Sequence, residues 1–240
     1  MLNCKKIFKK SLHYFIFQKN FSGCVGEYKN DNAGRSMLEM FGVLAIIGIL
    51  SIGAMAGYSK AMEKIKANKL VGEYNNLIWG LFDKVDDIHR ISTNNGALNG
   101  IVDYVQALSL VPETWQKVSS YKLYDSEKNI VQVFSRNNRL VVDFYIGGQI
   151  SNSLLVNTKG FSANLCQDIM SNIVKNFSNV LYYFRLIQWS KNDENATIYW
   201  GDRYCLEKHN CLRNLTISEI SSLCQLCKSD KETCGINIEF

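Results

Sequence analysis

Twenty consecutive residues without a charge constrain the fold of this chain more than any other feature. They run from Met40 to Ser59, and a helix of about 20 residues spans the roughly 30 Å hydrocarbon core of a bilayer. The sequence holds one such stretch, so we expect the chain to cross a membrane once. The alternative is a buried core helix, but core helices rarely run this long without a charge.

Residues 1–34 form a basic, polar segment ahead of the apolar run. The segment holds six lysines against Glu27 and Asp31, which favours a cytoplasmic N-terminus for a helix that spans a membrane. Four lysines between residues 60 and 69 weaken that charge rule. The apolar patch from Tyr14 to Phe17 is shorter than the roughly 7 to 15 residues of a secretory signal. We therefore expect a cytoplasmic leader.

Beyond Ser59 the chain shows the pattern of an amphipathic helix. Apolar residues recur at steps of three and four, with charged residues between them: Leu70, Val71, Tyr74, Leu77, Ile78, Leu81, Val85 and Ile88. Because no helix breaker separates this stripe from the uncharged run, we predict one helix of about 50 residues that continues to near Ile91. The turn-forming residues Asn94, Asn95 and Gly96 end it.

The remainder of the sequence predicts a mixture of short helices and strands. We expect helices at 101–110 and 162–176, the second capped by Ser162. Alternating apolar residues predict strands at 122–124, 130–134, 140–146, 180–189 and 197–204, and a final strand at the C-terminus. The fold class is therefore α+β: a long N-terminal helix, transmembrane in its first half and amphipathic in its second, packed on an antiparallel β-sheet with a cysteine-rich C-terminal region.

The junction of leader and apolar run carries the most specific motif. Residues 34–40 read GRSMLEM, which places the carboxylate of Glu39 at the edge of a hydrophobic helix. Such a group costs a few kcal/mol on insertion scales, so it indicates a function and a cationic partner. A basic leader ending in Gly34, a glutamate as the fifth residue after it and an uncharged span together resemble the type IV prepilins and the pseudopilins of type II secretion. The resemblance covers roughly residues 29–69.

This resemblance implies a mechanism of processing and assembly. A prepilin peptidase would cut between Gly34 and Arg35 and methylate the new amine of Arg35, and Glu39 of an incoming subunit would pair with that amine on a neighbour. The small residues Gly53 and Gly57 would let helices approach closely. Two features depart from the common pattern: residue 35 is arginine where phenylalanine or methionine is usual, and the leader is long, as in the type IVb subclass.

The same resemblance predicts three segments, several partners and a location. Residues 1–34 are the cleaved leader, 35–59 the transmembrane half of the helix, and 60–240 its amphipathic half with a pilin-like globular domain. The expected partners are other copies or other pilins, the prepilin peptidase, and the inner membrane with its assembly platform. The chain would lie in the inner membrane, crossing it once, and then in a periplasmic or extracellular filament.

Six of the eight cysteines follow the leader: Cys166, Cys205, Cys211, Cys224, Cys227 and Cys234. An even number beyond a membrane span predicts disulfides, and the sequence does not choose among their pairings. Because pilins commonly tie a C-terminal loop to the sheet, the resemblance implies a bridge from Cys166 to one of the last cysteines. The alternatives are a zinc site in which His209 joins these cysteines, and a redox pair of Cys224 and Cys227.

Nothing in the sequence predicts an enzyme or a cofactor. We find no Ser-His-Asp set and no metal-binding helix motif, and the aspartates at 83, 86 and 87 fit a solvated helix face. Aromatic residues gather late in the chain, which fits the core of a sheet better than a carbohydrate or DNA surface: Tyr182, Tyr183, Phe184, Trp189, Tyr199 and Trp200.

The net charge also gives no support to nucleic-acid binding. The leader holds six of the 27 basic residues and two of the 22 acidic residues, so the rest of the chain has 21 basic and 20 acidic residues. A nearly neutral chain gives no electrostatic reason for binding nucleic acid. We therefore expect a structural pilin-like subunit. A secretion pseudopilin, a membrane-anchored surface-binding or DNA-binding module, and an anchored zinc or redox domain are the alternatives.

Overall fold

The computed structural model describes residues 37–92, 96–146, 148–151, 154–157, 162–189, 194–226 and 233–240. The chain divides into two compact units within its first helix, Met1–Ser51 and Ile52–Phe240. The predicted leader at 1–34, which ends in Gly34, and the following Arg35 lie outside the described residues. The boundaries that we predicted at residues 34 and 59 stay predictions.

The fold is α+β, as the sequence predicts, with one long helix at the start of the described chain. The short π-helical segment Met170–Val174 follows the fourth α-helix directly, and Leu212–Asn214 forms a 3-10 turn. The α-helices are α1 (Met37–Phe82), α2 (Val85–Ile91), α3 (Val102–Ala107), α4 (Ala163–Ile169) and α5 (Ile217–Gln225).

The predicted helix of about 50 residues is wrong in one respect, because it is broken near its end. Helix α1 stops at Phe82 after 46 residues, and α2 begins at Val85. At the break the Lys84 N–H bonds to the Leu81 carbonyl, one residue short of the α-helical step. The turn brings Ile88, which is fully buried, into the core. Tertiary packing therefore breaks the helix, although the apolar stripe alone predicts that it continues.

Eight of the described strands form one antiparallel sheet in the order β2-β3-β4-β5-β10-β8-β9, with β1 paired to β4. The short strands β6 and β7 form a separate hairpin. The strands are β1 (Asn99–Gly100), β2 (Gln116–Lys117), β3 (Lys122–Tyr124), β4 (Ile130–Arg136), β5 (Arg139–Ile146), β6 (Gly148–Ser151), β7 (Leu154–Asn157), β8 (Tyr183–Trp189), β9 (Glu194–Trp200) and β10 (Thr233–Glu239).

The C-terminal strand occupies the middle of this sheet. Strand β10 pairs with β5 through Ile236 opposite Phe144, and with β8 through Ile236 opposite Leu186. The sequence places β10 nearly 90 residues after β5, so the sheet cannot form completely until residues 233–239 are available to pair. The order therefore depends on long-range contacts, which sequence periodicity does not report.

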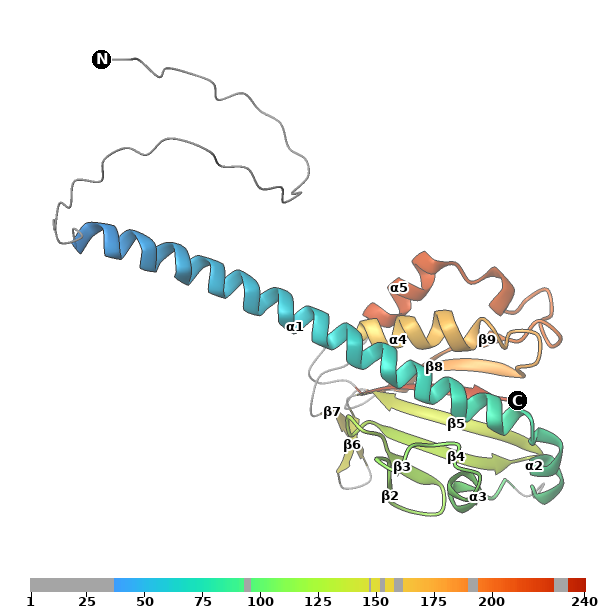
Figure 1. The fold of residues 1–240 in the computed structure, drawn as a ribbon. Helices are drawn as coiled ribbons and strands as arrows, with labels where there is room; N and C mark the ends of the chain where they lie inside the picture. Colours follow the sequence, from blue (N-terminus) through green and yellow to red (C-terminus); the bar gives the residue numbers. More distant parts are fainter. Residues whose placement is uncertain are drawn as a thin grey trace, which may run out of the picture. The chain divides into compact units, whose positions relative to one another are not determined.

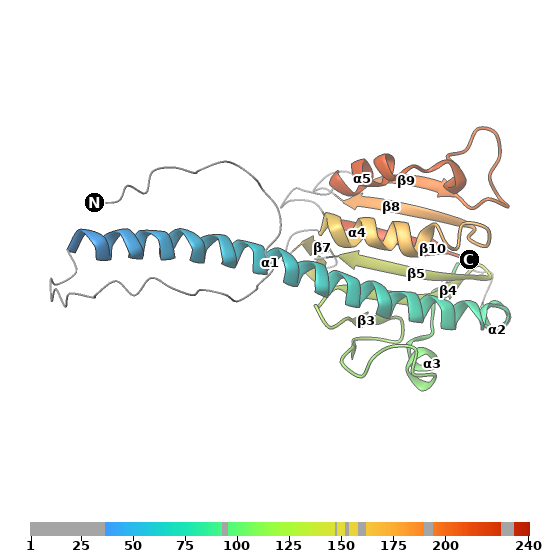
Figure 2. The same ribbon diagram turned by 45° about the horizontal axis from the view of Figure 1, so that its top comes forward.

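The core lies between one face of the sheet and the helices that cover it. Figure 1 and Figure 2 show the C-terminal part of α1 and helix α4 over the same face. The predicted stripe supplies Tyr74, Leu77 and Leu81, all fully buried. Side chains of period two on the central strands, such as Val142 and Phe144, meet them. The long helix thus packs on the sheet through the residues that the pattern selected.

Two other predictions need correction, and one is confirmed. The strand predicted at 197–204 runs from Glu194 to Trp200, because the chain turns at Gly201. Helix α5 was missed, although Thr216 and Glu219 form a capping box at its start. Ser162 does cap α4, accepting a hydrogen bond from the Leu165 N–H.

Candidate functional site

The N-terminal half of α1 presents apolar side chains to its surroundings along its described length. Phe41, Ile46, Ile49, Ile52 and Met55 are each more than half exposed. The helix from Glu39 to Phe82 is long and apolar enough to cross a membrane, by length and composition. Monomeric soluble proteins rarely expose a contiguous apolar surface of this kind.

The predicted assembly residues lie on this exposed half. Glu39 falls in the first turn of α1, where a carboxylate is favoured by the helix dipole. A Cβ added at Gly53 or at Gly57 meets no atom within 4 Å. The backbone at these glycines is therefore open to another helix. The structure does not test the roles that the resemblance gives to these three residues.

Two disulfides are present in the described part of the chain. Cys166 of α4 is bonded to Cys224 of α5, 58 residues later, and Cys205 is bonded to Cys211. The first bridge agrees with the prediction that Cys166 pairs with a cysteine near the C-terminus. Cys227 lies outside the described residues, and the side chain of Cys234 is not described.

In the described part of the chain, cysteines of both the zinc and the redox alternative are paired in disulfides. A cysteine binds zinc as a thiolate, whereas Cys205, Cys211 and Cys224 are each paired with another cysteine in this structure. Cys224 is bonded to Cys166 rather than to Cys227, so the spacing of two residues between Cys224 and Cys227 does not mark a redox pair. His209 instead stacks on Trp200, with the ring centroids 4.6 Å apart.

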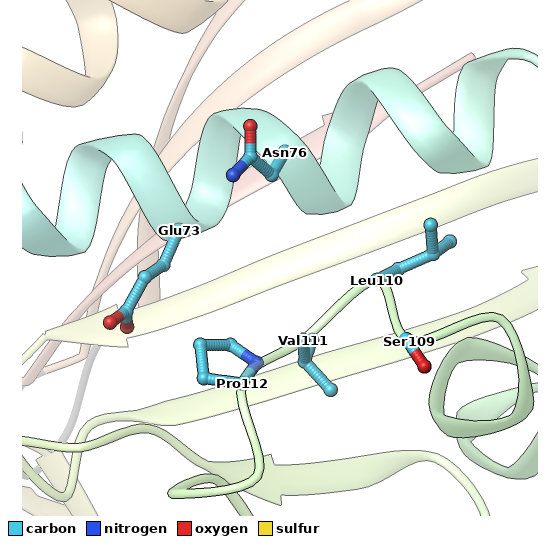
Figure 3. Close-up of a pocket in the computed structure, with 6 residues that line it drawn as sticks. All are labelled: Glu73, Asn76, Ser109, Leu110, Val111 and Pro112. Carbon is cyan, nitrogen blue, oxygen red and sulfur yellow. The ribbon is translucent and has the colours of Figure 1, made fainter.

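A shallow hollow of about 380 Å³ lies between α1 and the segment after α3. Its lining residues, drawn in Figure 3, are Glu73 and Asn76 of α1 and Ser109, Leu110, Val111 and Pro112 of that segment. The carboxylate of Glu73 accepts a hydrogen bond from the Trp115 indole at 2.9 Å and lies 3.7 Å from the Lys69 ammonium. This polar group already has partners, and the other lining groups offer no reactive chemistry.

The sheet face opposite α1 carries a buried polar network. Glu239 of β10 is 3% exposed and lies within 4.0 Å of the guanidiniums of Arg136, Arg139 and Arg185. The Tyr183 hydroxyl donates to the same carboxylate at 2.5 Å. Burial, together with this hydrogen bond and the carboxylate charge, raises the pKa of the Tyr183 hydroxyl. The three arginines therefore share one buried anion.

Asp143 lies beside this network on β5. Burial raises the pKa of its carboxyl to about 6, against the lowering effects of the Asn237 hydrogen bond and the Arg185 charge. The Asn237 amide donates to Asp143 and its oxygen accepts from Arg185 Nε at 2.9 Å. Asn237 therefore connects the carboxyl of Asp143 to the arginines.

Aromatic rings continue this surface toward the end of β9. The Tyr182 ring contacts those of Trp200 and Tyr204 at centroid distances of 5.1 and 4.9 Å, and the Arg139 guanidinium lies 3.5 Å from its centre. We call the set of Arg136, Arg139, Arg185, Tyr182, Trp200 and Tyr204 the arginine–aromatic patch.

The sequence reasoning did not find this patch. It assigned the late aromatic residues to the sheet core, which is right for Phe184 and for Tyr199, which packs against that core. Tyr182, Tyr183 and Trp200 are instead half-buried on the opposite face. The signal was present in β8, where Tyr183 and Arg185 alternate with Phe184 and Leu186.

Comparisons with known proteins returned no likeness: no family model matches the chain, and no curated protein or solved structure is detectably similar to it.

Proposed function

We propose that the chain is a structural subunit of a type IV filament, assembled through the N-terminal half of α1. One observation carries the proposal: a single helix has an exposed apolar half that begins with Glu39 and a second half that packs on a folded domain. A soluble protein would bury such a surface, whereas a subunit that moves from a membrane to a helical bundle keeps it available. The prepilin-like motif at residues 34–40 supports the same assignment.

Processing would create the charge pair that sets the register. Cleavage after Gly34 leaves an α-amine on Arg35, and the Glu39 carboxylate of the next subunit pairs with that amine. In an apolar bundle the attraction between opposite charges is strong and an unpaired carboxylate is costly, so one axial position is favoured over the others. Gly53 and Gly57 allow close packing of neighbouring helices.

The first experiment tests processing. The full chain is expressed with and without a prepilin peptidase, and the N-terminus of the product is sequenced. We expect an N-terminus at Arg35 when the peptidase is present, and loss of cleavage in Gly34→Leu. An intact leader in both conditions would overturn the proposal.

The second experiment tests assembly. We expect Glu39→Ala to be cleaved normally but to reduce the yield of sheared filaments at least about tenfold, because the unpaired amine remains in an apolar bundle. Glu63→Ala is the matched control, since Glu63 is an exposed carboxylate on the same helix beyond the uncharged run. Equal filament yields from the two variants would contradict the role of Glu39.

A further inference from the structure

The arginine–aromatic patch has more positive charge and more hydrogen-bond donors than the protein itself uses. Its three guanidiniums offer five N–H donors each, and their partners among the described residues are Glu239, Asn237 and the aromatic rings. The side chains of Arg136, Arg139 and Arg185 remain 33, 36 and 25% exposed. Three guanidiniums thus lie beside the carboxylates of Glu239 and Asp143, and each keeps part of its side chain in solvent, within reach of an anionic partner.

The packing of the rings argues against nucleic acid as that partner. Stacking of bases requires an open ring face. The Arg139 guanidinium covers Tyr182, and the His209 ring stacks on Trp200 with an interplanar angle of 16°. The Tyr182–Trp200 and Tyr182–Tyr204 contacts are edge-to-face. The patch therefore presents packed ring edges and guanidinium groups.

The patch has an apolar rim. It consists of Tyr204, a member of the patch that is 46% exposed, and the neighbouring Leu206, which is 67% exposed. Both lie at the disulfide-closed loop between Cys205 and Cys211, whose bond restricts the conformations of the loop. Arginine, tyrosine and tryptophan, which make up the patch, are the residues enriched in protein-binding hot spots.

We propose that the arginine–aromatic patch binds an acidic protein segment that also carries apolar side chains. Carboxylates of the segment form bidentate pairs with the guanidiniums, which match their planar geometry. Apolar side chains of the segment pack on Tyr204 and Leu206. This binding does not depend on the filament function, because the patch lies on the sheet and not on the apolar half of α1.

The test measures binding of a labelled peptide of alternating glutamate and leucine to the full chain in detergent, by fluorescence anisotropy at low and high salt. The same peptide with glutamine in place of glutamate tests the need for charge. A dT oligonucleotide of equal charge tests the nucleic-acid alternative. We expect the glutamate peptide to bind most tightly, and its affinity to fall as salt rises.

Three variants locate the binding. Arg139→Gln should weaken binding of the glutamate peptide about tenfold, since it removes a positive charge from the patch. Arg139 is the most distant of the three arginines from Glu239, at 3.9 Å, and its guanidinium otherwise contacts the Tyr182 ring. Tyr204→Ala should weaken binding about threefold through the rim. Arg90→Gln, a change at an exposed arginine on α2, should leave the affinity unchanged.

Four results would overturn the proposal. One is equal affinity for the glutamate and glutamine peptides, and another is tighter binding of the oligonucleotide. The third is an affinity that Arg139→Gln and Arg90→Gln change to the same extent. Circular dichroism of each variant separates loss of binding from loss of fold. Self-association of the chain that Arg139→Gln abolishes, without peptide binding, would assign the patch to contacts between copies and would equally overturn the proposal.

Discussion

Residue 201 shows how one position limits what the chain tolerates. A Cβ built on Gly201 would lie 1.7 Å from the Leu181 carbonyl oxygen. The Gly201 N–H also donates to the Tyr182 carbonyl at 3.1 Å, which fixes the turn after β9. Only glycine fits here, because the obstacle is backbone that cannot rotate away.

We therefore expect Gly201→Ala to lower the free energy of unfolding by about 3 kcal/mol. Gly72→Ala is the matched control, since Gly72 lies within α1 and a Cβ there meets nothing within 4 Å. Gly72→Ala should raise the free energy of unfolding by about 0.5–1 kcal/mol, because alanine has a higher helix propensity than glycine. Urea unfolding of the full chain in detergent measures both. Equal midpoints for the two variants would contradict the crowding at Gly201.

Asp143 gives the protein a pH-dependent stability. The pKa of its carboxyl is about 6 in the folded protein, above the ordinary 3.8, chiefly through burial. The folded state therefore binds this proton more tightly than the unfolded state, and the stabilising contribution grows as pH falls through 6 toward 4. Between pH 7 and pH 5 the gain is about 1 kcal/mol.

Replacing the carboxyl removes this contribution. We expect Asp143→Asn to lack the increase in stability between pH 7 and pH 5. The difference in free energy of unfolding between wild type and variant should therefore grow by about 1 kcal/mol, in favour of wild type, from pH 7 to pH 5. Asp103→Asn alters an exposed aspartate and should show no such difference. Urea midpoints at the two pH values give the measurement. A constant difference between wild type and Asp143→Asn would refute the role of Asp143.

At the scale of elements, α1 is anchored to the sheet by more than its apolar stripe. Tyr74 is fully buried and its hydroxyl donates to the Asp125 carboxylate in the turn between β3 and β4. Asp125 also accepts from the backbone N–H groups of Glu127 and Asn129, both at 2.8 Å. The helix is thereby bonded to a turn about 50 residues away in sequence.

We expect Tyr74→Phe to destabilise the fold by about 2 kcal/mol, because it leaves a buried carboxylate without one of its donors. Tyr58→Phe removes a hydroxyl from an exposed position on the same helix and should change nothing measurable. Thermal unfolding of both variants in detergent compares them. A loss of stability in Tyr58→Phe as large as that in Tyr74→Phe would point to a general effect on α1.

The sequence predicts most elements well and their ends less well. Period-two runs predict the three strands from β3 to β5, and the period of 3.6 predicts the buried face of α1. The break after Phe82 was not predicted, because its cause is the fit of Ile88 to the sheet rather than a local breaker. Helix α5 was missed despite its capping box, since its apolar pattern is short.

At the scale of the whole molecule, the two disulfides close loops of very different length. Cys166–Cys224 spans 58 residues and Cys205–Cys211 spans six. Both cysteines of the long bridge are fully buried, at the contact of α4 and α5. In the chain-entropy account a longer loop restricts the unfolded chain more. The long bridge should therefore contribute more to the stability of the domain.

Removing the pairs separately tests this ranking. We expect loss of the long bridge, by Cys166→Ala with Cys224→Ala, to lower the free energy of unfolding by about 4 kcal/mol. Loss of the short bridge, by Cys205→Ala with Cys211→Ala, should cost about 2 kcal/mol. Urea unfolding of each double variant gives the values. The reverse ranking would contradict the entropic account for this domain.

The sequence alone determined the features that depend on neighbouring residues. The uncharged run, the apolar stripe of α1, the strand periodicity and the motif around Glu39 are all local, because helix and strand periods act over a few residues. Tertiary structure decided what joins distant residues: the place of β10 between β5 and β8, the choice of Cys224 for Cys166, and the arginine–aromatic patch. Many pairings satisfy the same local pattern, and only the packing of the whole chain selects one of them.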